Sequence, residues 1–294
     1  MIAFASVYLV WGSTYLAIRF TLETLPVFLT AGVRFLIAGA ILYAFARLKQ
    51  DAGKTSTRHW RSAFIVGGFL LAGGNGSVVW AEQVIPSGLA ALIVATTPLW
   101  MVLLEWLWRK GKRPSASVLT GIAIGFSGVA VLILPDLAGS WHTVHLSGVF
   151  MLLAAAFFWA TGSVYSRTAH LPDSPFLATG MEMMAGGVLL ILMSLAQGEF
   201  LHLHFENVSF KSVGAFLYLI FFGSLVGFTA YIWLLKKVGV TRASTYAFVN
   251  PVVAVILGSF IAHEELTGHI LLAASLILFA VVMITAQKQT AAAS

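Results

Sequence analysis

The sequence contains no cysteine and few charged residues. Without cysteine, the chain can form neither a disulfide bond nor a thiolate metal site. Charged residues make up only 10% of the 294, whereas a soluble domain usually carries about 25%, and the mean hydropathy is +0.92. Because so little polar surface is available to face water, the composition predicts an all-α protein embedded in a lipid bilayer.

The sequence also lacks the motifs of common pumps and hydrolases. It has no Walker A sequence and no G-x-S-x-G, so ATP-driven pumping and serine hydrolysis have no support. The nearest approaches to a metal site are His263-Glu264 with His269, and His202 and His204 with Glu206. The first group misses the zinc-protease spacing, and we interpret both as solvated loop residues. We therefore expect no metal, no cofactor and no enzymatic activity, with a metal-dependent membrane enzyme as the alternative.

Ten apolar stretches follow one another along the chain, each close to the 20 residues that cross a hydrocarbon layer about 30 Å thick. They are residues 2–19, 28–48, 62–81, 88–107, 117–134, 147–165, 175–196, 213–235, 243–262 and 269–286. Each one predicts a transmembrane helix. No basic segment precedes the apolar run from Ile2, so we expect no cleaved signal peptide.

The basic residues predict the orientation of these spans. With a cytoplasmic N-terminus, all but three of the 17 lysines and arginines lie in cytoplasmic segments, and the exceptions are Arg19, Arg34 and Lys211. The positive-inside rule therefore predicts a multi-pass protein of the cell inner membrane with both termini in the cytoplasm. The net charge of +6 is then a topology signal, so we expect no nucleic-acid partner. The expected partners are a small-molecule substrate and membrane lipid, with the chain a monomer or homodimer.

The two halves of the chain repeat each other. At one constant shift the matching pairs are Trp11 with Trp159, Phe28 with Phe176, Gly32 with Gly180 and Gly39 with Gly187. At a slightly larger shift they are Ala90 with Ala243 and Pro98 with Pro251. Since five spans in each half reverse the second copy, we predict two inverted five-helix repeats, residues 1–135 and 147–287. Such repeats are typical of secondary transporters.

Two prolines lie near the middle of spans, where a helix is expensive to break. Pro98 and Pro251 are repeat mates, and each lacks an N–H and clashes with the carbonyl four residues earlier. A helix broken at this depth must face a cavity or packed protein, because lipid cannot satisfy its backbone. Asn250, directly before the second proline, adds a polar group that favours a cavity. A harmless kink is the alternative.

Two ionisable residues of opposite sign occupy equivalent repeat positions inside spans. Inversion places Arg34 nearer the outer edge and Glu182 nearer the cytoplasmic edge, about 10 Å apart along the membrane normal, so we expect no direct salt bridge. Arg34 is suited to attract a carboxylate, and Glu182 an ammonium group or a proton. The alternative for each is a structural role. Two further acids are expected at the membrane interface: Glu105 paired with Arg109, and Glu82 at the outer end of its span.

Aromatic residues in the spans indicate the walls of a binding site. Trp11 and Trp159 are repeat mates near span middles, where interfacial aromatic belts do not reach. They are suited to an apolar, aromatic or cationic ligand, and bulky helix packing is the alternative. The predicted central cavity combines Trp11, Tyr15, Arg34, Trp80, Pro98, Trp159, Tyr246 and Asn250, with Glu182 as the proton-coupling residue.

These motifs resemble those of the EamA family in the drug/metabolite transporter superfamily, and within it a YedA-like group. The likeness lies in residues 11–15 (WGSTY), 34–39, 79–82, 86–88, 162–165 and 246–267, and it covers essentially the whole chain. The resemblance implies ten helices, cytoplasmic termini and a central cavity open alternately to each side. It also implies export of amino acids, other metabolites or toxic compounds without ATP.

Together these features predict a secondary transporter that exports small organic metabolites or drugs by alternating access, possibly coupled to protons. An uptake carrier or a lipid-linked flippase of the same fold remains open, as does a purely structural membrane protein. The sequence leaves the substrate, the direction, the coupling ion and the oligomeric state undetermined.

Overall fold

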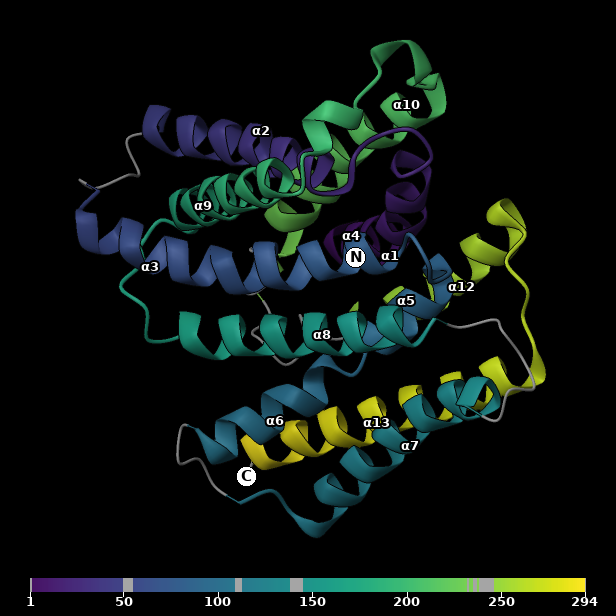
Figure 1. The fold of residues 1–294 in the computed structure, drawn as a ribbon. Coiled ribbons are helices and arrows are strands. Elements are labelled where there is room, and N and C mark those ends of the chain that lie inside the picture. The colour runs from purple at the N-terminus through teal and green to yellow at the C-terminus, as the bar shows by residue number, and fades with distance from the viewer. Residues whose placement is uncertain are drawn as a thin grey trace.

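The computed structural model describes residues 2–49, 55–108, 113–137, 145–231, 233, 234, 237 and 246–293, and these residues form helices and no strands (Figure 1). The α-helices are α1 (Ile2–Thr21), α2 (Val27–Leu48), α3 (Thr57–Gly67), α4 (Gly76–Ala81), α5 (Ser87–Val94), α6 (Thr97–Leu107), α7 (Ala116–Leu137), α8 (Leu146–Ser166), α9 (Pro175–Ala196), α10 (Phe210–Tyr218), α12 (Tyr246–Ala262) and α13 (Gly268–Ala293). The π-helices η1 (Gly68–Asn75) and η4 (Leu219–Val226) continue α3 and α10, and the 3₁₀ turns η2 (Glu199–His202) and η3 (Phe205–Asn207) follow α9.

Seven helical segments within the described residues are long and apolar enough to cross a membrane. They are Ile2–Thr21, Val27–Leu48, Thr57–Ala81, Ser87–Leu107, Leu146–Ser166, Pro175–Ala196 and Phe210–Tyr231. Three shorter apolar helices, Ala116–Leu132, Val249–Ala262 and Gly268–Ile284, occupy the remaining predicted spans. The prediction of an all-helical membrane protein is therefore confirmed.

Helices α2 and α9 cross each other closely through pairs of glycines. A Cβ atom on Gly39 would lie 2.8 Å from the carbonyl oxygen of Gly180, and one on Gly187 would lie 2.9 Å from that of Gly32. Residues early in α2 thus meet residues late in α9, so the two helices run antiparallel. Glycine permits this approach because it has no side chain to hold the backbones apart.

Helices α7 and α13 form a second antiparallel pair on the far side of the bundle. Gly121 contacts Ile284, and Gly128 contacts Ile277. Figure 1 shows α2 beside α9 at one end of the bundle and α7 beside α13 at the other, with α3 and α8 between them. In both pairs a helix from the first half of the chain packs on its predicted repeat mate.

The two π-helices lie at matching places in the two halves. Both are eight residues long, and each is followed directly by a glycine, Gly76 after η1 and Gly227 after η4. A π-helix widens the backbone and recurs at functional sites in membrane and soluble proteins. Neither deformation is predicted by the apolar pattern, which reads both segments as ordinary helix.

The two mid-span prolines behave differently. The segment Ser87–Leu107 is interrupted where α5 ends at Val94 and α6 begins at Thr97, with Pro98 in its first turn. The hydroxyl of Thr97 donates to the carbonyl oxygen of Val94 at 2.6 Å. This carbonyl, left without a backbone donor by Pro98, therefore has a hydrogen-bond partner within packed protein. In contrast, α12 continues through Pro251, and the predicted break there is wrong for the described backbone.

Candidate functional site

Trp11 lies in an aromatic cluster where α1 meets the segment Phe210–Tyr231 and α12. Its ring centroid is 5.0 Å from that of Tyr246, 5.1 Å from that of Tyr231 and 5.3 Å from that of Phe228. Its indole N–H donates to the carbonyl oxygen of Gly223 in η4 at 3.1 Å. Trp11 is therefore fixed by a hydrogen bond at one end and surrounded by rings, which is the geometry of a rigid wall.

Asn250 lies behind this cluster and is 7% exposed. With its amide nitrogen directed towards the backbone, it donates to the carbonyl oxygens of Tyr8 and Tyr246, each at 3.2 Å. The polar residue before Pro251 therefore ties α1 to α12 in the described structure, rather than lining a described cavity.

Arg34 reaches the same π-helix from α2. The residue is 5% exposed, and its Nε donates to the hydroxyl of Ser224 at 2.9 Å. A Cβ atom on Gly223 would lie 3.1 Å from Arg34 Nη2, so the guanidinium and the Trp11 indole meet η4 at one glycine. Arg34 and Glu182 form no ion pair, as their different predicted depths indicate. The structure thus brings Trp11, Arg34, Tyr246 and Asn250 into one region around η4 and α12.

Trp159 occupies the corresponding place in the other half. Its ring lies against η1, where a Cβ atom on Gly74 would be 3.2 Å from Trp159 Cε3. The next residue, Asn75, has a buried side-chain oxygen without a hydrogen-bond partner. Glu182 in α9 lies at the other end of η1, where its carbonyl oxygen packs against Gly67. Each of the two repeat-mate tryptophans therefore faces a π-helix of the opposite half.

The remaining predicted site residues are more scattered. Trp80 and Tyr15 are half-buried and pack against the hydrophobic core. Tyr15 is in α1, one turn after Trp11, and lies close enough to Glu82 and Tyr246 to interact electrostatically with both. Pro98 is half-buried at the break between α5 and α6. The cavities described in the structure are not lined by the predicted central set.

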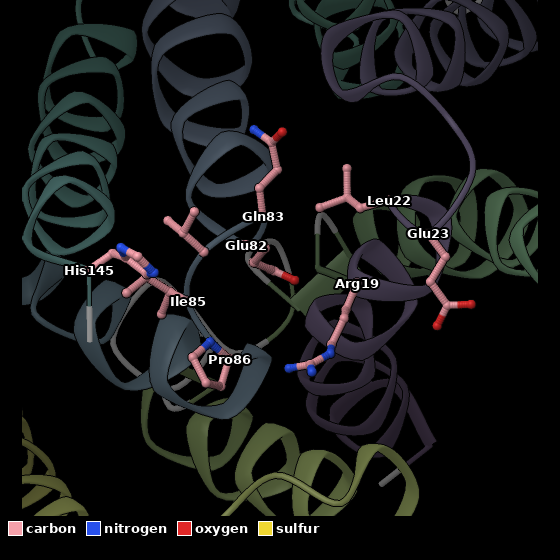
Figure 2. Close-up of a pocket in the computed structure, with 9 residues that line it drawn as sticks. Arg19, Leu22, Glu23, Glu82, Gln83, Ile85, Pro86 and His145 are labelled. Atoms are coloured by element: carbon pink, nitrogen blue, oxygen red, sulfur yellow. The ribbon is translucent and has the colours of Figure 1, made fainter. Parts of the chain in front are cut away.

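A cavity of about 610 Å³ lies instead where α1 and α4 end, on the side predicted to be external. Its lining includes Arg19, Glu23, Glu82 and His145 (Figure 2). Glu82 is 5% exposed, and neither carboxyl oxygen has a hydrogen-bond partner. Burial raises the pKa of the Glu82 carboxyl well above its ordinary value, the charge of Glu264 raises it further, and Arg19 lowers it.

Glu264 connects the loop between α12 and α13 to the first half of the chain. One carboxylate oxygen accepts from the backbone N–H and the hydroxyl of Ser87, both at 2.8 Å, and from Arg19 Nη1 at 2.7 Å. The other accepts from the N–H of Gly88 at 2.9 Å. The Glu264 side chain is only 6% exposed, and it caps the N-terminus of α5. We call these contacts of Glu264 with Arg19, Ser87 and Gly88 the external latch.

Glu199 makes a similar contact on the same side. Its two carboxylate oxygens accept from the backbone N–H groups of Phe28 at 3.0 Å and Leu29 at 2.8 Å, at the start of α2. The predicted loop that follows α9 is therefore fixed to the first half by its first acid. On the side predicted to be external, two acids from the second half cap two helices of the first half.

The opposite side carries a weaker connection between the halves. Arg167 Nη1 contacts Glu105 Oε1 at 2.9 Å, and the two side chains are 51% and 38% exposed. The predicted partner of Glu105, Arg109, lies outside the described residues. An exposed pair of this kind contributes about 0–1 kcal/mol, whereas the Glu264 carboxylate of the external latch is buried and accepts four hydrogen bonds.

Sequence reasoning missed the acids that carry this architecture. The sequence pattern indicates a solvated loop residue at Glu264 and an interfacial residue at Glu82, and nothing in it singles out Glu199. A usable signal exists for Glu264, because the resemblance to the EamA family includes it together with Pro86-Ser87-Gly88. Those two segments are the ones that the external latch joins.

The fold is that of a helical protein with several membrane-length apolar segments among the described residues. The chain belongs to the EamA-like transporter family, whose pattern matches residues 1–134 and 146–286. It is 39% identical to the uncharacterised inner membrane transporter YedA of Escherichia coli over 287 residues, which cover 97% of this chain and 90% of YedA. It is 26% identical to a probable amino-acid metabolite efflux pump of Escherichia coli, over 92% of this chain and 90% of that protein. A solved crystal structure at 22% identity shares the fold, with a TM-score of 0.63 over 98% of this chain and 97% of its own.

Proposed function

We propose that this protein is a secondary transporter that exports small organic solutes across the inner membrane by alternating access. The observation that carries the proposal is the placement of Trp11 and Trp159, since each lies against a π-helix of the opposite half. A solute path between two such matched elements has a wall from each half, and rocking of the halves changes which end is open.

The antiparallel crossings support two inverted repeats of five helices, residues 1–135 and 147–287. In the proposed topology all ten helices cross the membrane, and both termini lie in the cytoplasm. The external latch and the Glu199 cap would close the outer end, while the exposed pair of Glu105 and Arg167 leaves the inner end easier to open. The relative named as an amino-acid metabolite efflux pump supports the export direction.

Within this path, Trp11, Arg34 and Trp159 are the proposed substrate-binding residues with the strongest structural support. Arg34 is buried without a carboxylate partner among the described residues, which suits it to attract an anionic group. Tyr15, Trp80, Pro98, Tyr246 and Asn250 complete the proposed set. Glu182 is the proposed proton carrier.

The test is solute counterflow in liposomes that contain the purified chain. Labelled amino acids, polyamines and cationic drugs are offered with and without a pH gradient. Saturable exchange of one class, reduced at least tenfold in Trp11→Ala, is the expected result. Trp108→Ala is the matched control, because Trp108 is 50% exposed at the end of α6.

Proton coupling has its own comparison. Glu182→Gln should abolish the response to the pH gradient, whereas Glu206→Gln, at a loop carboxylate 74% exposed, should retain it. A Glu182→Gln protein that keeps the full rate and pH response would exclude the proposed proton carrier. Exchange of no class of solute would favour a lipid substrate or a structural role over the proposed function.

A further inference from the structure

The titratable residues that line the cavity at the ends of α1 and α4 are the acids Glu23 and Glu82, together with Arg19 and His145. Glu264 is paired with Arg19, and Glu23 is paired with Lys211. Glu82 lines the same cavity and has neither an ion pair nor a hydrogen bond in the structure. An ionised Glu82 would therefore have no paired counter-ion among the described residues.

The surroundings of Glu82 explain why no side chain of the protein takes that place. Arg19 lines the cavity, but its Nη1 is held by Glu264, which is fixed in turn by two N–H groups of α5. The other titratable groups around Glu82 are Tyr15 from α1, and Glu23 and His145 in the cavity lining. Figure 2 shows the Glu82 side chain directed towards the side of the cavity that Arg19 lines.

We propose that this cavity binds the ammonium group of a small organic amine, with Glu82 as its counter-ion. This inference rests on the proposed transport function and adds the charge class of a solute at the external mouth. A volume of about 610 Å³ lies within the range of small-molecule sites, so the cavity admits the amine together with its organic body. A buried carboxylate that gains a hydrogen-bonded cation is strongly favoured over one left alone.

Binding at this site exchanges a cation for a proton. Because burial raises the pKa of Glu82, the empty cavity favours the protonated form of this carboxyl group. Entry of R–NH₃⁺ gives an ammonium–carboxylate pair, and the carboxyl proton leaves to the external water. One positive charge enters and one leaves, so the net charge of the cavity is unchanged. Amine binding should therefore become tighter as pH rises, about tenfold per unit, until Glu82 is already ionised.

The experiment measures binding of benzylamine to the full chain in lipid nanodiscs by titration calorimetry. Benzyl alcohol is the neutral probe of nearly the same shape. Two buffers that differ in ionisation enthalpy report how many protons are released. We expect benzylamine to bind with release of up to one proton, and benzyl alcohol to bind much more weakly.

Variants separate Glu82 from its neighbours. Glu82→Gln should weaken benzylamine binding by about 10- to 100-fold, as for loss of a charge-assisted contact, and should remove the proton release. Glu82→Asp should retain proton release with weaker binding. Glu23→Gln, in the same cavity, should change the affinity less than about twofold, because its carboxylate is exposed and already paired with Lys211.

Equal benzylamine affinity in the unmodified chain and Glu82→Gln would overturn the site, as would benzyl alcohol binding as tightly as benzylamine. The two proposals fail separately. Counterflow of some solute without amine binding would overturn the site and leave the transport function intact. Amine binding that requires Glu82, without counterflow of any solute, would support the site and count against transport.

Discussion

Removal of the Glu264 carboxylate should open the outer end of the protein. Glu264→Ala leaves the N–H groups of Ser87 and Gly88 without an acceptor at the start of α5. Loss of a helix cap costs about 1 kcal/mol, and loss of buried charge-assisted hydrogen bonds costs about 1.5–3 kcal/mol. The ion pair with Arg19 adds little, since Arg19 is 39% exposed. The latched state should therefore lose about 3 kcal/mol relative to an open one.

A change of about 3 kcal/mol alters the ratio of closed to open molecules by about 100-fold. The cysteine-free chain makes this measurable, because an introduced cysteine is the only thiol present. Ala90 lies in the first turn of α5 behind the external latch and is 0% exposed. In proteoliposomes, Ala90→Cys should react with a membrane-impermeant maleimide about 100-fold faster when Glu264→Ala is added.

Two controls distinguish opening from general loosening. Glu265→Ala changes the neighbouring exposed carboxylate and should leave the labelling rate at Ala90→Cys unchanged. Ala46 lies near the C-terminal end of α2, on the side predicted to be cytoplasmic, and is 2% exposed. Ala46→Cys should stay protected from the maleimide when Glu264→Ala is added. The reasoning is refuted if Glu264→Ala leaves the rate at Ala90→Cys unchanged, or if Glu265→Ala accelerates it equally.

Three further predictions concern stability. Glu82→Gln should raise the melting temperature, and the increase should grow from pH 5 to pH 8. Burial raises the pKa of Glu82, so the folded state binds the proton more tightly than the unfolded chain does. The unmodified protein therefore loses stability as pH rises, and the Gln variant does not. A difference in melting temperature between Glu82→Gln and the unmodified protein that shrinks as pH rises would contradict this. Gly39→Ala should cost about 1–3 kcal/mol because its Cβ would lie 2.8 Å from the backbone of α9, whereas Gly214→Ala, with open space around it, should be neutral or stabilising. Thermal unfolding of both variants checks this, and equal melting temperatures would count against the close crossing. Thr97→Val should cost about 1 kcal/mol by leaving the Val94 carbonyl without its hydroxyl donor, and the exposed Thr120→Val should cost less. A larger loss of stability in Thr120→Val than in Thr97→Val, measured by denaturant or heat unfolding, would argue against the hydrogen bond from Thr97 to Val94.

The helices were predictable because the signal for a membrane span is local. Runs of apolar residues of the right length define each segment, and the structure places helix ends within a few residues of the predicted bounds in most cases. The break before Pro98 followed from the same local chemistry. Pro251 did not break α12, because the described helix continues through it to Ala262 despite the missing N–H.

The candidate site was harder to predict because its contacts join distant parts of the chain. Glu264 and Ser87 are 177 residues apart, and Glu199 and Phe28 are 171 apart. The local sequence around an acid in an external loop does not indicate which backbone N–H group it will cap. The repeat could identify Trp11 and Trp159 as equivalent, but the segments of the two π-helices that they face, GFLLAGGN and LIFFGSLV, share no distinct sequence pattern.

The glycine crossing of α2 and α9 has a consequence for how such a chain could arise. Gly32 and Gly180 are repeat mates, as are Gly39 and Gly187, yet the contacts join Gly32 to Gly187 and Gly39 to Gly180. Each contact therefore joins the first glycine position of one half to the second glycine position of the other half. The same contact occurs twice, with the roles of the two halves exchanged. A surface that meets an identical surface in this way is self-complementary. If the predicted repeat is correct, two separate copies of one unit would already possess this interface before any fusion joined them.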